Sequence, residues 1–104
     1  MNPLFRSGYH IIGLPSGGQV LEMRTVEIVE GVEWNGDQFV GCRDLSTGFV
    51  TRYHSSEIRS STPVSADEAE AFLSVAGALS FSPRFYEHLA LAKNLVEMKK
   101  RPVA

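Results

Sequence analysis

The spacing of apolar residues changes at Pro63, and this change constrains the fold more than any other feature of the chain. Before Pro63, apolar and polar residues alternate, which is typical of half-buried strands; after it, apolar residues recur every third or fourth position, as in amphipathic helices. The 104 residues suffice for one modest core and not for two. We therefore expect one α+β domain over residues 1–104, with a β unit at 9–60 and a helical unit at 65–100.

The first half predicts antiparallel strands separated by turns rich in glycine. The expected strands cover about residues 9–14, 19–29, 38–44 and 49–55, and a short fifth strand or turn follows at 57–60. In the second strand the apolar positions change parity between Met23 and Val26, which predicts a bulge or bend near Arg24. Strands of small barrels bend in this way, so we expect a five-stranded SH3/Sm-like antiparallel β-barrel.

The second half carries two helix start signals. Ser65 with Glu68 forms a capping box, and Ser82-Pro83 is typical of an N-cap followed by proline in the first turn. A connection of about three residues, 80–82, predicts a C-terminal αα-hairpin that packs on the barrel. The second helix, which ends near Lys100, is apolar over more than a third of its circumference. We expect it to cover the open side of the barrel or to pair with another chain.

The central hairpin predicts which side chains share a face. An even-numbered loop at 45–48, closed by Gly48 in the left-handed conformation, places Asp44 opposite Phe49. The core face then carries Val40, Cys42, Phe49 and Tyr53, and the opposite face carries Phe39, Arg43, Val50, Arg52 and His54. Guanidinium groups beside aromatic rings are typical of anion or nucleotide contacts. Alternatively, Phe39 and Val50 pack beneath the helices while the charged groups are simply solvated.

The same region resembles a known family. The carrying residues are the run from Gly36 to Asp44, followed by Gly48, Thr51, Tyr53 and Ile58, and upstream Ile11-Ile12, Gly17-Gly18 and Arg24-Thr25-Val26. They resemble the WYL domain, a small Sm/SH3-like barrel of bacterial regulators, over residues 9–58. Gln38 occupies the tryptophan position of the family, and Thr51 its strand arginine, with Arg52 displaced by one residue. The resemblance implies a sensor of nucleotides or single-stranded nucleic acid.

These features together predict a non-enzymatic binding module for an anionic or nucleotide-like ligand. The candidate ligand-binding residues are Arg24, Phe39, Arg43, Arg52 and His54. A net charge of −2 argues against coating of nucleic acid through bulk electrostatics, so any anion site must be local. No 18 consecutive apolar residues occur, and we expect a cytoplasmic protein that does not enter a membrane.

Two other classes of function remain open. A structural or assembly protein of a phage, plasmid or mobile element would form a homodimer or larger oligomer through its C-terminal helices. An enzyme would have to use Cys42 and His54, and in the expected register Cys42 faces the core, where thiols are usually inert. The histidines His10, His54 and His88 lack the spacing of metal ligands. We therefore expect no catalytic residue, no metal and no cofactor.

Overall fold

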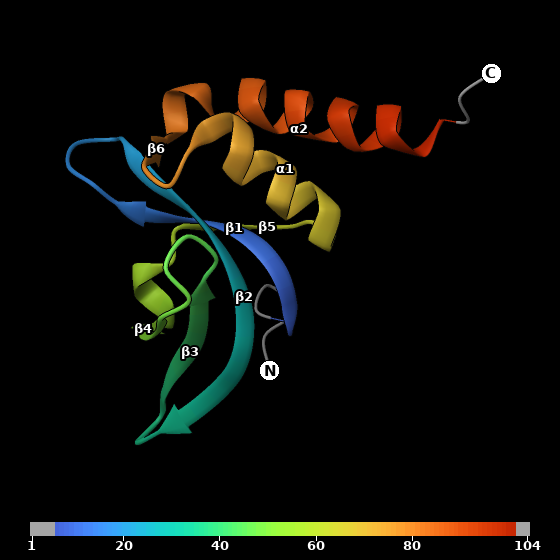
Figure 1. The fold of residues 1–104 in the computed structure, drawn as a ribbon. Coiled ribbons are helices and arrows are strands. Elements are labelled where there is room, and N and C mark those ends of the chain that lie inside the picture. The colour runs from blue at the N-terminus through green and yellow to red at the C-terminus, as the bar shows by residue number, and fades with distance from the viewer. Residues whose placement is uncertain (1–5, 102–104) are drawn as a thin grey trace.

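The computed structural model describes residues 6–101 and shows an α+β fold (Figure 1). The expected single domain also included residues 1–5 and 102–104, which lie outside the described residues. The strands are β1 (Gly8–Pro15), β2 (Leu21–Trp34), β3 (Asp37–Asp44), β4 (Val50–His54), β5 (Ser60–Pro63) and β6 (Ser80–Phe81). The helices are α1 (Ala66–Ala76) and α2 (Phe85–Lys100), with 3-10 turns η2 (Ser55–Glu57) and η3 (Ser82–Arg84).

The strands form one antiparallel sheet in the order β4-β3-β2-β1-β5, and β6 pairs with β2 beyond the end of β3. The class predicted from the sequence is confirmed, but the sheet does not close into the expected barrel. Closure would require β4 to pair with β5, and these two strands form the open edges of the described sheet. After β4 the chain turns through η2, and the Arg59 N–H donates to the Gly13 carbonyl at 2.8 Å. This contact aligns β5 along β1 rather than along β4.

Two apolar cores lie on opposite faces of the β1–β2 ribbon. The strand core consists of Ile12, Val26, Ile28, Val40, Cys42 and Ile58. The helix core consists of Ile11, Met23, Phe72, Phe85, Leu89 and Ala92. We call the face that carries the strand core the inner face, and the face on which α1 and α2 pack the outer face. We expected α2 to cover the open side of a barrel or to pair with another chain. Instead, α1 and α2 cover the outer side of β1 and β2.

These two cores explain the change of parity in β2. Residues 21–28 of β2 pair with β1 in an unbroken register, so the bulge offered as one of the two alternatives near Arg24 does not occur. Met23 points to the helix core on one face, and Val26 points to the strand core on the other. The parity changes because the buried face changes. The true irregularity lies between Ile28 and Glu30, where the register with β3 shifts by one residue.

The helical layer begins at α1 as the sequence predicts, but the link between α1 and α2 differs from the prediction. The capping box is confirmed: Glu68 N–H donates to Ser65 Oγ at 3.1 Å, and Ser65 N–H donates to Glu68 Oε1 at 2.9 Å. The helix ends at Ala76, before Gly77 with φ of 81°, so Leu79 lies outside it and is exposed.

The link between α1 and α2 contains β6 and η3 and is not the tight turn that we expected. Ser82 Oγ accepts a hydrogen bond from the Leu21 N–H at 2.9 Å instead of capping α2. The two helices nevertheless run in opposite directions (Figure 1), and the rings of Phe72 and Phe85 lie 5.8 Å apart between them.

The molecule is elongated, with the tip of the β2–β3 hairpin and the C-terminal end of α2 at its two ends (Figure 1). The stripe predicted from the sequence, Phe85, Leu89, Ala92 and Val96, is buried. The C-terminal part of α2 extends beyond the sheet (Figure 1), and the longest dimension of the described molecule is 57 Å. Neither described helix has the length and apolar character that a membrane crossing requires.

Candidate functional site

The register of the central hairpin is confirmed. Phe39, Val40, Gly41, Cys42 and Arg43 of β3 lie opposite His54, Tyr53, Arg52, Thr51 and Val50 of β4, respectively. Val40 and Cys42 are buried on the inner face, as predicted. Phe49 is 75% exposed and does not belong to the core, because it precedes β4 in the turn that Gly48, with φ of 80°, closes. The expectation that Phe49 would be a core residue is therefore wrong.

Two of the predicted arginines lie on the outer face, and each pairs with a glutamate of β2. Arg43 forms an ion pair with Glu27, its direct neighbour in the sheet. Arg52 Nε lies 2.5 Å from Glu30 Oε1. The hydrogen bond from Arg52 holds the pKa of Glu30 below its usual value, and the carboxylate in turn raises the pKa of Arg52. The outer face thus presents neutralised pairs rather than free positive charge.

Gly41 makes the pair between Glu30 and Arg52 possible. It lies between these residues in neighbouring strands, opposite Glu30 in β2 and Arg52 in β4. A Cβ atom at this position would collide with the Cγ of Glu30. Because glycine has no side chain, Glu30 crosses β3 and reaches the next strand.

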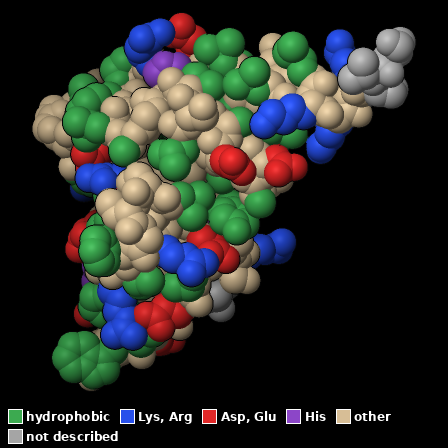
Figure 2. Space-filling view, in the orientation of Figure 1, with side chains coloured by type: hydrophobic (Ala, Val, Ile, Leu, Met, Phe, Trp, Pro, Cys, Tyr) green, Lys and Arg blue, Asp and Glu red, His purple; other side chains and the backbone are tan. Residues whose placement is uncertain are grey.

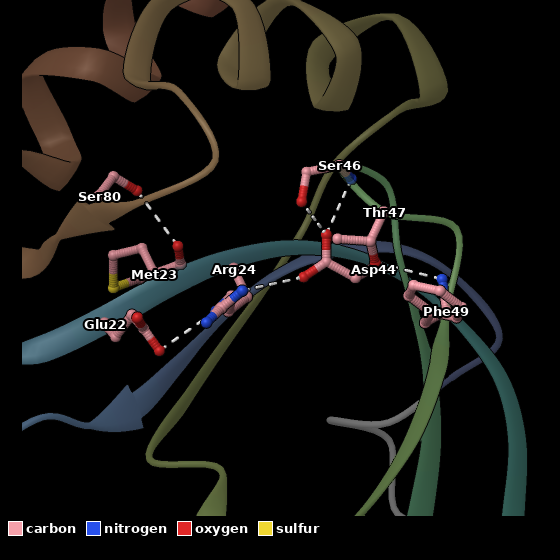
Figure 3. Close-up of polar contacts among 8 residues, drawn as sticks. All are labelled: Glu22, Met23, Arg24, Asp44, Ser46, Thr47, Phe49 and Ser80. Atoms are coloured by element: carbon pink, nitrogen blue, oxygen red, sulfur yellow. Dashed lines mark hydrogen bonds and ion pairs between the residues drawn. The ribbon is translucent and has the colours of Figure 1, made fainter.

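Arg24 lies apart from the other candidates, on the inner face (Figure 3). Its guanidinium pairs with Glu22 and with Asp44, each at 3.2 Å. Asp44 Oδ1 also accepts hydrogen bonds from the backbone N–H and the hydroxyl of Ser46, at 2.8 and 2.5 Å. The side chain of Arg24 therefore ties the β3–β4 turn to β2. It does not join Arg43 and Arg52 on one surface.

His54 and Phe39 form a fixed aromatic pair on the outer face. Their ring centroids lie 5.2 Å apart in an edge-on arrangement. His54 Nδ1 accepts from the Ser56 N–H at 3.1 Å, which leaves the proton on Nε2 to be donated to Asp37 Oδ1 at 3.0 Å. Cys42 lies on the opposite face, and burial raises the pKa of its thiol to about 11. The thiol and the imidazole that an enzyme would need are thus separated by the sheet.

A hollow on the outer face brings Arg52 and Phe39 together with a residue that the sequence analysis did not select. Val32, Trp34, Phe39 and Arg52 line a space of about 310 Å³, which we call the Trp34 hollow. Trp34 is 67% exposed and ends β2 at a tight turn in which Asn35 and Gly36 have φ of 51° and 83°. Figure 2 shows hydrophobic side chains beside basic ones at this end of the molecule.

One signal in the sequence pointed to the Trp34 hollow. A lone tryptophan directly before an Asn-Gly turn lies at the tip of a hairpin, beyond the reach of the core. Exposed tryptophan is uncommon and is enriched in binding surfaces. The pairing of Trp34 with Asp37 places its side chain on the same face as Phe39 and Arg52, and this requires the register of β2 with β3.

The comparisons with known proteins returned nothing: no family model, curated protein or solved structure matches this chain. Between residues 6 and 101, no three acidic, histidine or cysteine side chains are grouped so that they could hold a metal ion.

Proposed function

We propose that the protein is a non-enzymatic binding module whose Trp34 hollow takes an anionic, nucleotide-like ligand, either a free nucleotide or a segment of single-stranded nucleic acid. The exposure of Trp34 beside Phe39 and Arg52 carries this proposal. The indole face would stack on a base, and the guanidinium would contact a phosphate. Stacking of one base on an aromatic side chain contributes about 1–3 kcal/mol.

The pairing of Arg52 with Glu30 leaves most of its donors for a ligand. Only Nε of Arg52 is hydrogen-bonded within the described chain, and a guanidinium has five N–H donors. The outer fork can therefore contact two oxygens of a phosphate while Nε remains on Glu30. Because Glu30 neutralises part of the charge, binding should depend more on stacking than on long-range attraction.

The resemblance to the WYL domain supports the same function. In the observed strand order β4 and β5 are the two edges, so pairing of these edges would produce the five-stranded barrel of that family. We propose that the open sheet is a variant of this SH3/Sm-like barrel, with the helical hairpin added on its outer side. A sensor that binds nucleotides on the outer face of its strands fits this arrangement.

The test uses Trp34, the only tryptophan of the chain, as reporter. The full protein is titrated with nucleotides and short single-stranded oligonucleotides at two salt concentrations. We expect quenching of the fluorescence with a dissociation constant below about 1 mM at low salt, weakening as salt is raised. Anisotropy of a labelled oligonucleotide should show about tenfold weaker binding for Trp34→Leu and for Arg52→Gln.

Arg84→Gln is the matched control. Arg84 also pairs with a glutamate, Glu87, at 2.9 Å, and its side chain is 64% exposed, as is that of Arg52. This variant should bind like the wild type, whereas equal losses in Arg52→Gln and Arg84→Gln would indicate nonspecific charge effects. Absence of binding tighter than about 1 mM at low salt would show that the proposed function is wrong.

A second candidate function is assembly, and the outer side of α2 favours it. Leu91, Leu95 and Met98 are 48%, 41% and 64% exposed and follow one another at helical spacing. The first turn of α2 carries the acidic Glu87, and the last turn carries Lys99 and Lys100. Two copies of α2 packed antiparallel would therefore join their apolar stripes and bring opposite charges together. We propose a homodimer on this surface, as in an assembly component of a phage, plasmid or mobile element.

Light scattering on the purified chain tests the assembly function. At about 0.1 mM we expect the mass of a dimer, and Leu95→Lys should convert it to a monomer. Glu97→Lys is the control, because Glu97 lies two residues along the helix and therefore about 200° around it from Leu95. A strictly monomeric wild type at this concentration would exclude an obligate interface. Equal effects of both variants would contradict the placement of the interface.

A further inference from the structure

A second hollow lies where the start of β1 meets the end of β5, on strands that do not contribute to the Trp34 hollow. It has a volume of about 320 Å³, and its polar lining includes Arg6, His10 and Ser61. No carboxylate of residues 6–101 lines this space. We call it the β1–β5 hollow, and three observations on its lining point to one class of ligand.

The hydroxyl of Ser61 is buried without a partner. Its Oγ atom has essentially no contact with solvent and makes no hydrogen bond within the described chain. Ser61 pairs with Ile12 in the sheet, so the backbone places this side chain at the hollow. Buried polar groups are almost always hydrogen-bonded, because an unpaired one loses its hydrogen bonds to water and gains none within the protein. An unpaired hydroxyl at a hollow is the arrangement expected when a bound group completes the site.

The ring of His10 offers one further atom. His10 is 4% exposed, and Nδ1 lies 3.2 Å from the carbonyl oxygen of Gly8. A carbonyl only accepts, so Nδ1 carries the proton in this contact. Nε2 has no hydrogen-bond partner among residues 6–101 and is left for a ligand: it accepts when the ring is neutral and donates when the ring is charged.

Arg6 supplies a charge that no described carboxylate neutralises. Arg24, Arg43 and Arg52 each form an ion pair with an acidic residue, whereas Arg6 forms none with any residue of the described range. A guanidinium can hold two oxygens of one phosphate or carboxylate group through parallel hydrogen bonds. This hollow therefore combines a free cation, an unpaired hydroxyl and a histidine, with no competing acid among the described residues.

We infer that the β1–β5 hollow is a binding site for a small oxyanion, a phosphate or carboxylate group carried by a small molecule. The Arg6 guanidinium contacts two of its oxygens, and the Ser61 hydroxyl rotates about χ1 into the hollow and donates to another. Nε2 of His10 accepts from the remaining hydroxyl of a hydrogen phosphate or, when the ring is charged, donates to a carboxylate. The volume is at the lower end of the range of small-molecule sites, about 300–1,000 Å³.

The experiment follows the backbone amides of the full chain by NMR during titration with inorganic phosphate and, separately, with acetate at constant ionic strength. We expect saturable shifts at the start of β1 and in β5 with at least one of these anions. Saturation with phosphate alone assigns a phosphate group, and saturation with acetate alone assigns a carboxylate. The absence of saturable shifts with either anion would overturn the inference.

Three variants separate this site from general charge effects. Arg6→Gln and Ser61→Ala should each weaken anion binding by about tenfold, the usual effect of losing a charge-assisted hydrogen bond. Arg59→Gln is the control, because Arg59 is exposed, lies next to β5 and is also without a described ion pair; it should change the affinity by less than about twofold. Equal losses in Arg6→Gln and Arg59→Gln would contradict the site.

Ser61→Ala can also be followed by its melting temperature. A hydroxyl with a purely structural role would not change the melting temperature and the anion affinity together. Removal of an unpaired buried hydroxyl should raise the melting temperature in the absence of anion, while anion binding becomes weaker. A gain in stability with unchanged anion binding would show that the hydroxyl is only a packing defect. Trp34→Leu should leave anion binding at this hollow unchanged, so failure of the proposed nucleotide function and failure of this inference are distinguishable.

Discussion

Among single residues, Cys42 should make the stability of the protein depend on alkaline pH. Its thiol is 1% exposed in the strand core, and burial raises its pKa from an ordinary value of 9.0 to about 11. The native state therefore keeps a proton that the unfolded chain loses. The stabilisation is complete below about pH 9 and disappears as the pH rises through about 11, with a total loss of about 2–3 kcal/mol for this group.

Urea unfolding at a series of pH values between about 8 and 11 measures this dependence. Burial also raises the pKa of Tyr53, which adds a loss in the same direction. Cys42→Val keeps an apolar side chain of similar size and removes the ionisable thiol, so its stability should fall less steeply over the same range. Identical slopes for Cys42→Val and the wild type would contradict the prediction.

Gly41 should control the affinity of the Trp34 hollow for anions. A methyl group at this position meets the side chain of Glu30, which is flexible and can move away. We expect Gly41→Ala to separate Glu30 from Arg52 and so to strengthen binding of a nucleotide-like ligand several-fold, with little change in the unfolding midpoint. Glu30→Gln, which removes the charge directly, should have the same effect. Fluorescence titration measures both variants, and unchanged affinity in both would exclude Glu30 as a competitor of the ligand.

Among the elements, those with local signals were predictable from the sequence. The capping box of Ser65 and the even-numbered loop that Gly48 closes fix their neighbours within a few residues, and both are confirmed. The parity change in β2 is visible in the sequence, but its cause is not, because the sequence does not show that Met23 and Val26 face different cores. Ser82 has the composition of an N-cap, yet its oxygen accepts from Leu21, which lies 61 positions away in the chain. Such long-range partners leave no local signal.

Ser82→Ala should therefore weaken the contact between the helical layer and β2. The start of α2 should keep its stability, because Ser82 does not cap that helix. The substitution leaves the Leu21 N–H without its partner, and we expect a loss of about 1 kcal/mol in the free energy of unfolding. Amide hydrogen exchange should accelerate at Leu21, while the first turn of α2 keeps its protection. Ser65→Ala, by comparison, should cost about 1 kcal/mol through loss of a true cap and should affect the first turn of α1. Faster exchange at the start of α2 in Ser82→Ala would show that Ser82 does cap that helix.

For the whole molecule, the class of fold was predictable and the closure of the sheet was not. The change of period at Pro63 separates β1 to β5 from the two helices, although the short strand β6 lies on the helical side. Whether a sheet closes depends on its two edge strands, which are separated in the chain by only a short turn and carry no pattern that specifies pairing. The candidate site was also predictable only in part. The hairpin register correctly places Phe39, Arg43, Arg52 and His54 on one face. The face on which Arg24 lies follows from the pairing of β1 with β2, which the sequence does not show.

The division of the interior into two cores has a consequence for how the molecule opens. One layer of backbone separates the strand core from the helix core, so the helices can detach while the strands remain folded. We expect two cooperative units in native-state hydrogen exchange, with the amides of α1 and α2 exchanging through a smaller opening than those of β2 and β3. Phe72→Leu should accelerate exchange in the helices alone, whereas Val40→Ala, at a cost of about 1–3 kcal/mol, should accelerate exchange throughout the chain. Uniform acceleration in both variants would mean that the two cores unfold as one.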